Sequence, residues 1–385
     1  MDAEDVLNLL HFHRFLLAET RARLPLFRRA IAGTVKPGDT VLDLGTGSGI
    51  LAFLACRAGA RRVYAVDVDA AVELARLLAT ENGFADRVVV LAGPSRRIEL
   101  PERVDVVVSD TFDTCGLQSG GLRSFIDARE RLLKPGGALI PASLELFVAP
   151  VELPDVYRRE IDWWSRSRQG LDLSAVRTLA VNNRHPVHAP PRSLLAKPRS
   201  VARVDLRQVS DVMLQGTIRV TARRSGTLHG LCGWFVATLA RGVTIDNRPG
   251  ASPTNYRQAF FPLARPVRVQ AGHRIEVSLT SHDSIHWRWQ VAVKASARAG
   301  RETVRFDHST FFGSLTPAQL LHGKAPDHAP RLNRRGEAQR FLLGLADGAT
   351  PIAKLRRRVL DRYPDVVGTE GEASTFISDV LSWCT

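Results

Sequence analysis

The turn GTGSG, residues 45–49, places glycines at alternate positions directly after the β-type run TVLDL. Glycine has no Cβ, so such a turn lets a bound ligand approach the backbone closely. The helical run ILAFLACRAG comes next, followed by a second β-type run, RVYAVDVD. Asp67 lies in that run about 20 residues beyond the turn, where a carboxylate can accept both hydroxyls of a ribose. These residues predict a nucleoside-binding site.

A second set of polar residues lies in the loop SDTFDTCGLQSGGL, residues 109–122, which follows the apolar run VDVVV. It contains two carboxylates, Asp110 and Asp113, and a thiol, Cys115. Asp110 ends its strand at the edge where open α/β sheets bind ligands, and there it could orient a substrate or accept a proton. Contact with a cofactor or the backbone is the simpler role for such an acid. Cys115 is more simply an incidental thiol.

The segments around these residues alternate between strand and helix. The stretches RVVVLAGPSRRIELPERVDVVVSD and LLKPGGALIPASLELFVAP supply further strands after the two already described. Strands that alternate with helices favour a parallel sheet of the α/β class.

The sequence LDLGTGSG resembles the first motif of class I S-adenosylmethionine (SAM) methyltransferases, a strand ending in D/E-x-G-x-G-x-G. It differs from the GxGxxG spacing of nicotinamide enzymes. The resemblance implies a Rossmann-like domain, SAM as the cofactor, and a displacement on a sulfonium methyl that requires alignment and exclusion of water. The cofactor-binding residues implied are Asp43, Gly45, Thr46, Gly47, Gly49, Asp67, Val68, Pro94, Ser95 and Asp110.

Residues 13–330 resemble the protein arginine methyltransferase family in the order and spacing of several stretches. FLLAETRARLPLFRRAI is similar to the family's helix over the cofactor, and it puts Arg21 where an arginine pairs with the methionine carboxylate. IELPERVDVVVSDTFDT, CGWFVATL and SPTNYRQAFFPL follow in matching order. The resemblance implies a SAM-binding Rossmann-like domain at 1–145, an antiparallel β-barrel substrate domain at 146–328 and a small helical domain at 329–385.

The chain departs from the family at the acceptor side. The loop 109–122 aligns with the family's double-E loop, in which two glutamates clamp a substrate guanidinium, but here Asp110 and Ser119 stand at the two positions. The family's Thr-His-Trp loop reads Thr254-Asn255-Tyr256, and Arg96 replaces a glutamate that contacts adenine in many members. We therefore expect a preserved cofactor pocket and an altered acceptor pocket.

These departures favour a bacterial SAM-dependent methyltransferase whose acceptor is not arginine, with Asp110, Tyr256 and Asn255 as catalytic candidates. A buried ion pair that loses one partner costs about 3–5 kcal/mol, so a guanidinium beside one carboxylate would be poorly compensated. The alternative is a protein arginine N-methyltransferase with a degenerate clamp, in which Asp113 could replace the second glutamate. A non-catalytic scaffold is a further alternative. A nucleic-acid-binding protein is the least favoured, because few aromatic residues interleave with the arginines.

Positive charge is concentrated in the middle third. Residues 151–330 hold 26 Lys and Arg against 13 Asp and Glu, whereas 1–150 hold 18 against 19 and 331–385 hold 9 against 7. A basic field favours an acidic partner, so an anionic small molecule or peptide fits this region better than an arginine-rich substrate does. The arginine content of a GC-rich genome is the simpler explanation.

Two further segments suggest partners. DGATPIAKL, between helical runs in the last domain, resembles small PqqD-like, winged-helix-type domains, which grip leader peptides by β-augmentation. A three-helix cap or a dimer contact is the alternative. The family's dimerisation arm would fall at 155–200, where Trp163 and Trp164 indicate either a homodimer or a substrate wall.

The remaining features concern location. No run reaches the roughly 18 apolar residues of a membrane span, and the acidic start lacks the basic region of a secretory signal. The four cysteines, Cys56, Cys115, Cys232 and Cys384, are widely spaced and fit reduced thiols better than disulfides or a zinc site. We expect a cytoplasmic protein with no membrane contact and no metal.

Overall fold

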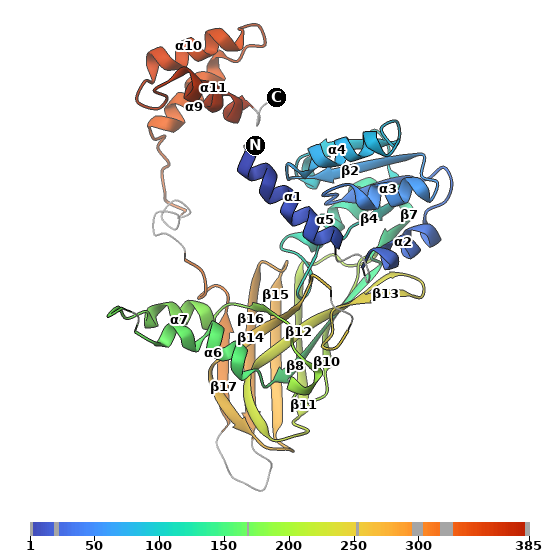
Figure 1. Cartoon of the computed structure of the whole chain (residues 1–385), viewed down its shortest axis with the longest axis vertical. Helices are drawn as coiled ribbons and strands as arrows, with labels where there is room; N and C mark the ends of the chain where they lie inside the picture. Colours follow the sequence, from blue (N-terminus) through green and yellow to red (C-terminus); the bar gives the residue numbers. More distant parts are fainter. Residues whose placement is uncertain are drawn as a thin grey trace. The chain divides into compact units, whose positions relative to one another are not determined.

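The computed structural model describes residues 3–18, 23–167, 169–251, 254–294, 303–315 and 326–381. The chain forms two compact units, residues 1–314 and residues 315–385, and each is described by itself. The first unit contains a parallel sheet and a region of antiparallel sheets, and the second contains helices (Figure 1).

Within the described residues, five parallel strands form the first sheet in the order β3-β2-β1-β4-β7. The run TVLDL is buried along its whole length and VDVVV nearly so, as expected for parallel strands covered on both faces. β1 lies between β2 and β4, so the carboxyl ends of these three strands form one edge. The strands are β1 (Thr40–Leu44), β2 (Arg62–Asp67), β3 (Val88–Ala92), β4 (Val104–Val108) and β7 (Leu133–Ile140).

Helices cover this sheet. The helical run after the glycine turn forms α3, which packs on β1 and β2 and is followed by Gly59 at a φ of 107°, the left-handed end that the sequence predicted. α4 packs on β2 and β3, and the π-helical turn η2 packs on β4 and β7. The helical elements of this part are α1 (Ala3–Ala18), α2 (Arg23–Thr34), α3 (Ile50–Arg57), α4 (Ala71–Glu81), η1 (Ser95–Arg97), α5 (Gly121–Asp127) and η2 (Ala128–Leu132).

The region after residue 142 forms two antiparallel sheets rather than the β-barrel that the sequence predicted. One sheet has the order β10-β8-β12-β14-β9, with β13 paired to β12, and the other has the order β11-β15-β16-β17. No strand ladder among the described residues closes them into a barrel. Each sheet buries one face in a shared core: on β16, Trp287 and Trp289 are buried whereas Arg288 and Gln290 are exposed. This two-residue period leaves the opposite face of the sheet in solvent.

The strands of this region are β8 (Ser143–Val151), β9 (His185–Val187), β10 (Arg199–Asp205), β11 (Met213–Thr221), β12 (Gly226–Ala240), β13 (Val243–Asp246), β14 (Gln258–Val269), β15 (Arg274–His282), β16 (His286–Lys294) and β17 (Val304–Ser309). The expected arm forms α6 (Pro154–Glu160), η3 (Asp162–Ser165) and α7 (Ser174–Val181), and a short turn, η4 (Pro191–Ser193), follows. In the arm, Trp163 is 40% exposed, whereas Trp164 packs against the core under α6.

The second unit has its own small core, built from helices α9 (Arg334–Leu345), α10 (Ile352–Arg362) and α11 (Glu370–Leu381). Leu342, Val359 and Phe376 are buried at its centre. The described residues 326–381 contain no strand, so they offer no strand edge to a peptide bound by β-augmentation. The leader-peptide contact therefore stays a prediction, and no strand edge among the described residues 326–381 supports it.

The cysteines and the helices bear on the expected location. Cys56, Cys115 and Cys232 are free and buried, and Cys384 lies outside the described residues. Among the helices that the structure describes, none has the length and apolar character needed to cross a membrane. The cytoplasmic location stays a prediction.

Candidate cofactor and acceptor site

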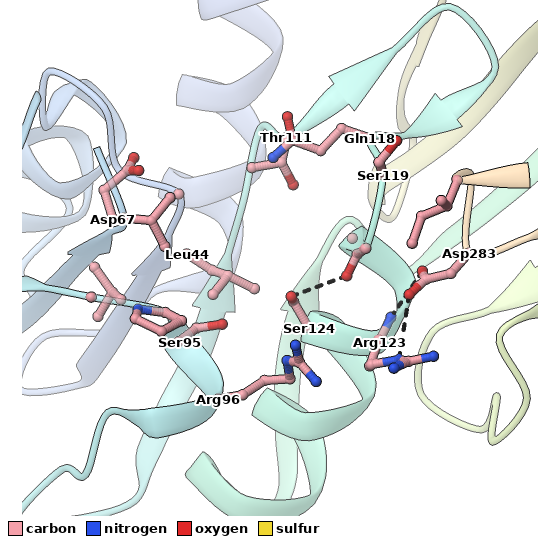
Figure 2. A pocket seen from close by; sticks show the side chains of 18 residues that line it. Leu44, Asp67, Ser95, Arg96, Thr111, Gln118, Ser119, Arg123, Ser124 and Asp283 are labelled. Carbon is pink, nitrogen blue, oxygen red and sulfur yellow. Dashed lines mark hydrogen bonds and ion pairs between the residues drawn. The ribbon is translucent and has the colours of Figure 1, made fainter. Parts of the chain in front are cut away.

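A pocket of about 310 Å³ lies at the carboxyl edge of the parallel sheet, beside the glycine turn (Figure 2). Figure 2 shows Asp67 on one side of it and Arg123 with Asp283 on the other. The wall is formed by the ends of β1 and β2, the segments that follow β3 and β4, the start of α5 with the residues before it, and the turn between β15 and β16. Its residues are Leu44, Gly45, Val66, Asp67, Val68, Gly93, Pro94, Ser95, Arg96, Thr111, Gln118, Ser119, Gly120, Gly121, Arg123, Ser124, Asp283 and Ile285.

The glycine turn has the geometry for close approach to the backbone. Gly45, Gly47 and Gly49 all have positive φ, at 75°, 53° and 84°. A Cβ added at Gly45 would collide with the Thr111 methyl, and one added at Gly47 would lie 2.9 Å from the His13 ring. Only glycine therefore fits these positions without strain.

Asp67 ends β2 and faces the pocket. Its Oδ2 accepts the Gly47 N–H at 2.8 Å and its Oδ1 accepts the Asp69 N–H at 3.1 Å. These bonds fix the carboxylate beside the turn, where the hydroxyls of a bound ribose would lie. Val68, Pro94 and Ser95, also predicted to contact the cofactor, line the same pocket.

Asp43 and Thr46 lie beneath the turn. Asp43 is fully buried, and its Oδ2 accepts the Thr46 hydroxyl at 2.7 Å and the Ala52 N–H at 3.0 Å. Burial raises the pKa of this carboxyl to about 7. The bonds brace the turn against the start of α3, and neither side chain lines the pocket. Direct contact of these two residues with the cofactor stays a prediction.

The arginine expected over the cofactor, Arg21, lies outside the described residues. Arg23, at the start of α2, is buried and forms an ion pair with Asp110. Sequence reasoning missed this residue, because it assigned the role to Arg21 and did not use the four-residue spacing of Arg23, Phe27 and Ile31. Burial of an arginine on the otherwise apolar face with Phe27 and Ile31 would have been the signal.

Asp110 forms a buried cluster with Arg23 and Tyr256. Its Oδ2 pairs with the Arg23 guanidinium, and its Oδ1 accepts the Tyr256 hydroxyl. Tyr256 in turn packs edge-on against Phe112 and Phe235. The structure thus brings together Asp110 and Tyr256, which are far apart in the sequence.

The cluster has a distinctive electrostatic state. Burial raises the pKa of the Asp110 carboxyl to about 6, although the Arg23 charge and the Tyr256 hydrogen bond act in the opposite direction. Burial, together with the negative charge of Asp110, also raises the pKa of the Tyr256 hydroxyl well above its ordinary value. Tyr256 is therefore a hydrogen-bond donor at neutral pH, and Asp110 is ionised above about pH 6.

Asn255, the third catalytic candidate, precedes Tyr256 on the same loop and is half-buried. Its side-chain oxygen is buried and accepts no hydrogen bond from the described residues. An unpaired buried acceptor costs free energy unless a ligand or water completes it. Asn255 could therefore accept a hydrogen bond from a bound molecule.

Asp113 and Ser119 occupy different surroundings. Asp113 pairs with the Arg184 guanidinium at 2.5 Å and accepts the Cys115 N–H at 2.9 Å, which fixes the hairpin of β5 (Phe112–Asp113) and β6 (Gly116–Leu117). These contacts hold Asp113 to the hairpin and to Arg184, and its replacement of a second clamp residue stays a prediction. Ser119 lines the pocket and donates to the Ser284 carbonyl at 3.2 Å.

Asp283 is a pocket residue that the sequence did not reveal. It lies in the turn between β15 and β16 with a φ of 50°, and its carbonyl accepts the Gly120 N–H at 2.9 Å. Its carboxylate accepts the Arg123 N–H at 3.3 Å and faces the Arg123 Nε at 3.5 Å (Figure 2). No local pattern in the sequence of this turn predicted that it would reach the parallel-sheet region and line a pocket there.

The residues present fit a sulfonium nucleoside. The pocket joins a turn without Cβ atoms, a fixed strand-end carboxylate and apolar walls from Leu44, Val66 and Pro94. The strand order, the turn after β1 and the acid that ends β2 define a class I SAM-dependent methyltransferase.

Comparisons with known proteins show which methyltransferases this chain resembles. A model of the arginine methyltransferase oligomerization subdomain matches residues 142–296, and a model of ribosomal protein L11 methyltransferase matches residues 26–143. The chain is 32% identical over 282 residues to protein arginine N-methyltransferase 6 of Xenopus laevis, covering 70% of this chain and 82% of the relative. It is 31% identical over 280 residues to an arginine N(omega)-methyltransferase of Streptomyces achromogenes subsp. streptozoticus, covering 71% and 76%.

The solved structure of Arabidopsis thaliana protein arginine methyltransferase 10 has the same fold, with a TM-score of 0.68 at 24% identity over 78% of this chain and 98% of that one. The chain belongs to the protein arginine methyltransferase family.

Proposed function

We propose that this chain transfers the methyl group of SAM to an ω-nitrogen of arginine, as a free amino acid or within a peptide. The observation that carries the proposal is the buried Asp110 carboxylate, two residues beyond β4 and next in the chain to Thr111, which lines the pocket. Relatives that are named arginine methyltransferases support the same acceptor. The sequence alone favoured a non-arginine acceptor, because Ser119 and Asn255 depart from the family pattern. Arginine was the alternative there and is the preferred acceptor here.

SAM supplies an electrophilic methyl group when it is bound. Asp67 would accept the ribose hydroxyls, Val68, Pro94 and Ser95 would enclose the base, and the turn 45–49 would let the remaining chain pass along the backbone. The role of Arg21 toward the methionine carboxylate stays a prediction. Among the described residues of this segment, Arg23 forms an ion pair with Asp110, which supports a role for it beside the acceptor.

Asp110 would orient the acceptor and take its proton. A guanidinium nitrogen that forms a bond to the methyl carbon must lose one proton, while the bond from carbon to sulfur breaks and S-adenosylhomocysteine leaves. An ionised carboxylate has about four lone-pair positions, so the bonds from Arg23 and Tyr256 leave capacity for the acceptor. Asn255 would accept a second hydrogen bond through its unpaired oxygen.

A non-arginine acceptor is the second candidate. It is favoured by the serine at position 119 and by the engagement of both Asp110 oxygens, because a cation would then face a single, partly satisfied carboxylate. An uncharged amine or hydroxyl acceptor would need only one group to orient it and remove its proton.

The family match also supports an oligomer. The matched subdomain, residues 142–296, includes the arm with its exposed Trp163. A homodimer formed through this arm would bury apolar surface of α6 and η3. Light scattering of the purified protein, compared with that of Trp163→Ser, tests this assembly.

The acceptor is tested by incubating the full chain with methyl-labelled SAM and three acceptors: a Gly-Arg-rich peptide, its lysine counterpart and free arginine. The proposal expects label in an arginine acceptor and none in the lysine peptide. Micromolar cofactor binding without label in any arginine acceptor would contradict it and favour the second candidate.

A further inference from the structure

The proposed methyl transfer makes no use of most of the positive charge of the middle third, and part of this charge gathers on one surface. The outer face of the sheet β11-β15-β16-β17 carries five exposed cations and two acids among the described residues. The cations are Arg219, Arg274, Arg288, Lys294 and Arg305, and the acids are Glu276 and Asp307. We call this surface the basic sheet face.

The strand register places these side chains in neighbouring rows. Arg274 lies directly opposite Lys294, and Thr221 lies opposite Arg274 on its other side. In the next row Glu276 lies between Arg219 and Ala292, and Ala292 is paired with Arg305. Directly paired residues point to the same side of a sheet, so these side chains share the solvent face.

Only part of this charge is neutralised. Arg219 pairs with Glu276 at 2.6 Å and Arg288 pairs with Asp307 at 2.6 Å. Arg274, Lys294 and Arg305 are exposed and have no ion-pair partner among the described residues. Three cations thus remain around one corner of the face.

The surface at this corner is hollowed. A depression of about 280 Å³ is lined by Glu276, Ser278, Gln290, Val291, Ala292, Arg305, Phe306 and Asp307. Phe306 is paired with Val291, and both belong to the inward face of the sheet. The small Ala292 side chain leaves the gap between Glu276 and Arg305. The Ser278 hydroxyl is bonded to that of Thr217 at 2.8 Å, and the Gln290 amide donates to Asp307 at 2.8 Å and keeps a second N–H. Hydroxyl, amide and guanidinium groups can all donate to a carboxylate.

We infer that the basic sheet face binds an acidic segment of a partner polypeptide, whose carboxylates would pair with Arg274, Lys294 and Arg305. Charge complementarity points to an anionic partner. A polypeptide suits the face better than a nucleic acid, because none of the outward side chains of these four strands is Phe, Tyr or Trp.

The test uses the full chain without cofactor, so its result does not depend on the methyl acceptor. A fluorescein-labelled 20-residue poly-glutamate peptide is titrated with wild-type protein and with the triple variant R274T/K294T/R305T, in which threonine keeps a strand-favouring side chain. The matched control is R28A/K36A/R57A, which removes three exposed charges from the other domain. Thermal unfolding of both variants checks that they are folded.

The inference expects binding that weakens as salt is added, a loss of about tenfold in the triple variant, or 1.4 kcal/mol, and little change in the control. Equal binding by the two variants would overturn it, as would no binding by the wild type at low ionic strength. Tighter binding of a 20-nucleotide oligothymidylate than of poly-glutamate would overturn the choice of partner.

Discussion

The two halves of the proposed site are built in different ways. The proposed cofactor half consists of the turn 45–49 and Asp67, which lie within one strand–helix–strand unit and are joined by a hydrogen bond between Gly47 and Asp67. The proposed acceptor half joins Arg23, Asp110 and Tyr256, which come from three distant segments. The first half is fixed by local backbone geometry, whereas the second depends on how the β-rich region packs on the sheet. The acceptor half can therefore change its chemistry while the cofactor half is preserved.

The largest expected effect comes from breaking the cofactor half. Gly47→Val adds a branched side chain where φ is 53° and where a Cβ would already lie 2.9 Å from His13. We expect SAM affinity to fall by about 100-fold or more, from backbone strain together with steric overlap. Calorimetric titration measures this, and Gly33→Ala, where nothing lies within 4 Å of the added Cβ, is the control. Unchanged affinity would show that the turn does not hold the cofactor.

The acceptor half is broken by Asp110→Asn. The substitution removes the carboxylate that is proposed to orient the acceptor, so kcat is expected to fall by about 100-fold or more while the cofactor affinity is kept. Tyr256→Phe, which leaves the carboxylate in place, should cost much less. Equal loss of kcat in both variants would indicate that the cluster is structural, and a loss of cofactor affinity in Asp110→Asn would assign that residue to the other half.

Ser119→Glu tests whether a second carboxylate in the acceptor half improves the use of an arginine substrate. A second carboxylate at the pocket wall would share the charge of a guanidinium, and we expect kcat/KM for a Gly-Arg-rich peptide to rise about tenfold. Ser119→Gln has the same shape without the charge and should not reproduce the gain. A fall in kcat/KM for Ser119→Glu would favour the uncharged acceptor of the second candidate.

The smallest effect concerns the stability of the turn as pH changes. The pKa of buried Asp43 is raised to about 7, so its neutral form is favoured in the folded state. A raised pKa contributes stability below the unfolded value of about 4, and this contribution is lost as pH rises through 7. Asp43→Asn, which resembles the neutral acid, should therefore raise the urea midpoint more at pH 8, where the contribution is fully lost, than at pH 5, where only part of it is lost. Identical shifts at both pH values would show that Asp43 is not neutralised on folding.

The sequence predicts local features of the site well and long-range contacts poorly. The glycine turn, Asp67 and the end of α3 at Gly59 are local features, and their spacing was sufficient to place them. Asp283 reaches the pocket from a turn more than a hundred residues away from Gly120, and no local pattern encodes that approach. Alternating strands predicted the β-rich region, but the alternation fixes only which face is buried. It does not fix whether the strands close into a barrel or pair as two sheets.

The central claim is that an intact cofactor half delivers a methyl group to a guanidinium held by Asp110. The most direct test is fragmentation mass spectrometry of a Gly-Arg-rich peptide incubated with the full chain and SAM, beside the Asp110→Asn variant. We predict a mass increase on an arginine side chain that fragments as an ω-methylguanidinium and is lost in the variant. Methylation located on any other atom, or of equal extent in the variant, would contradict the account.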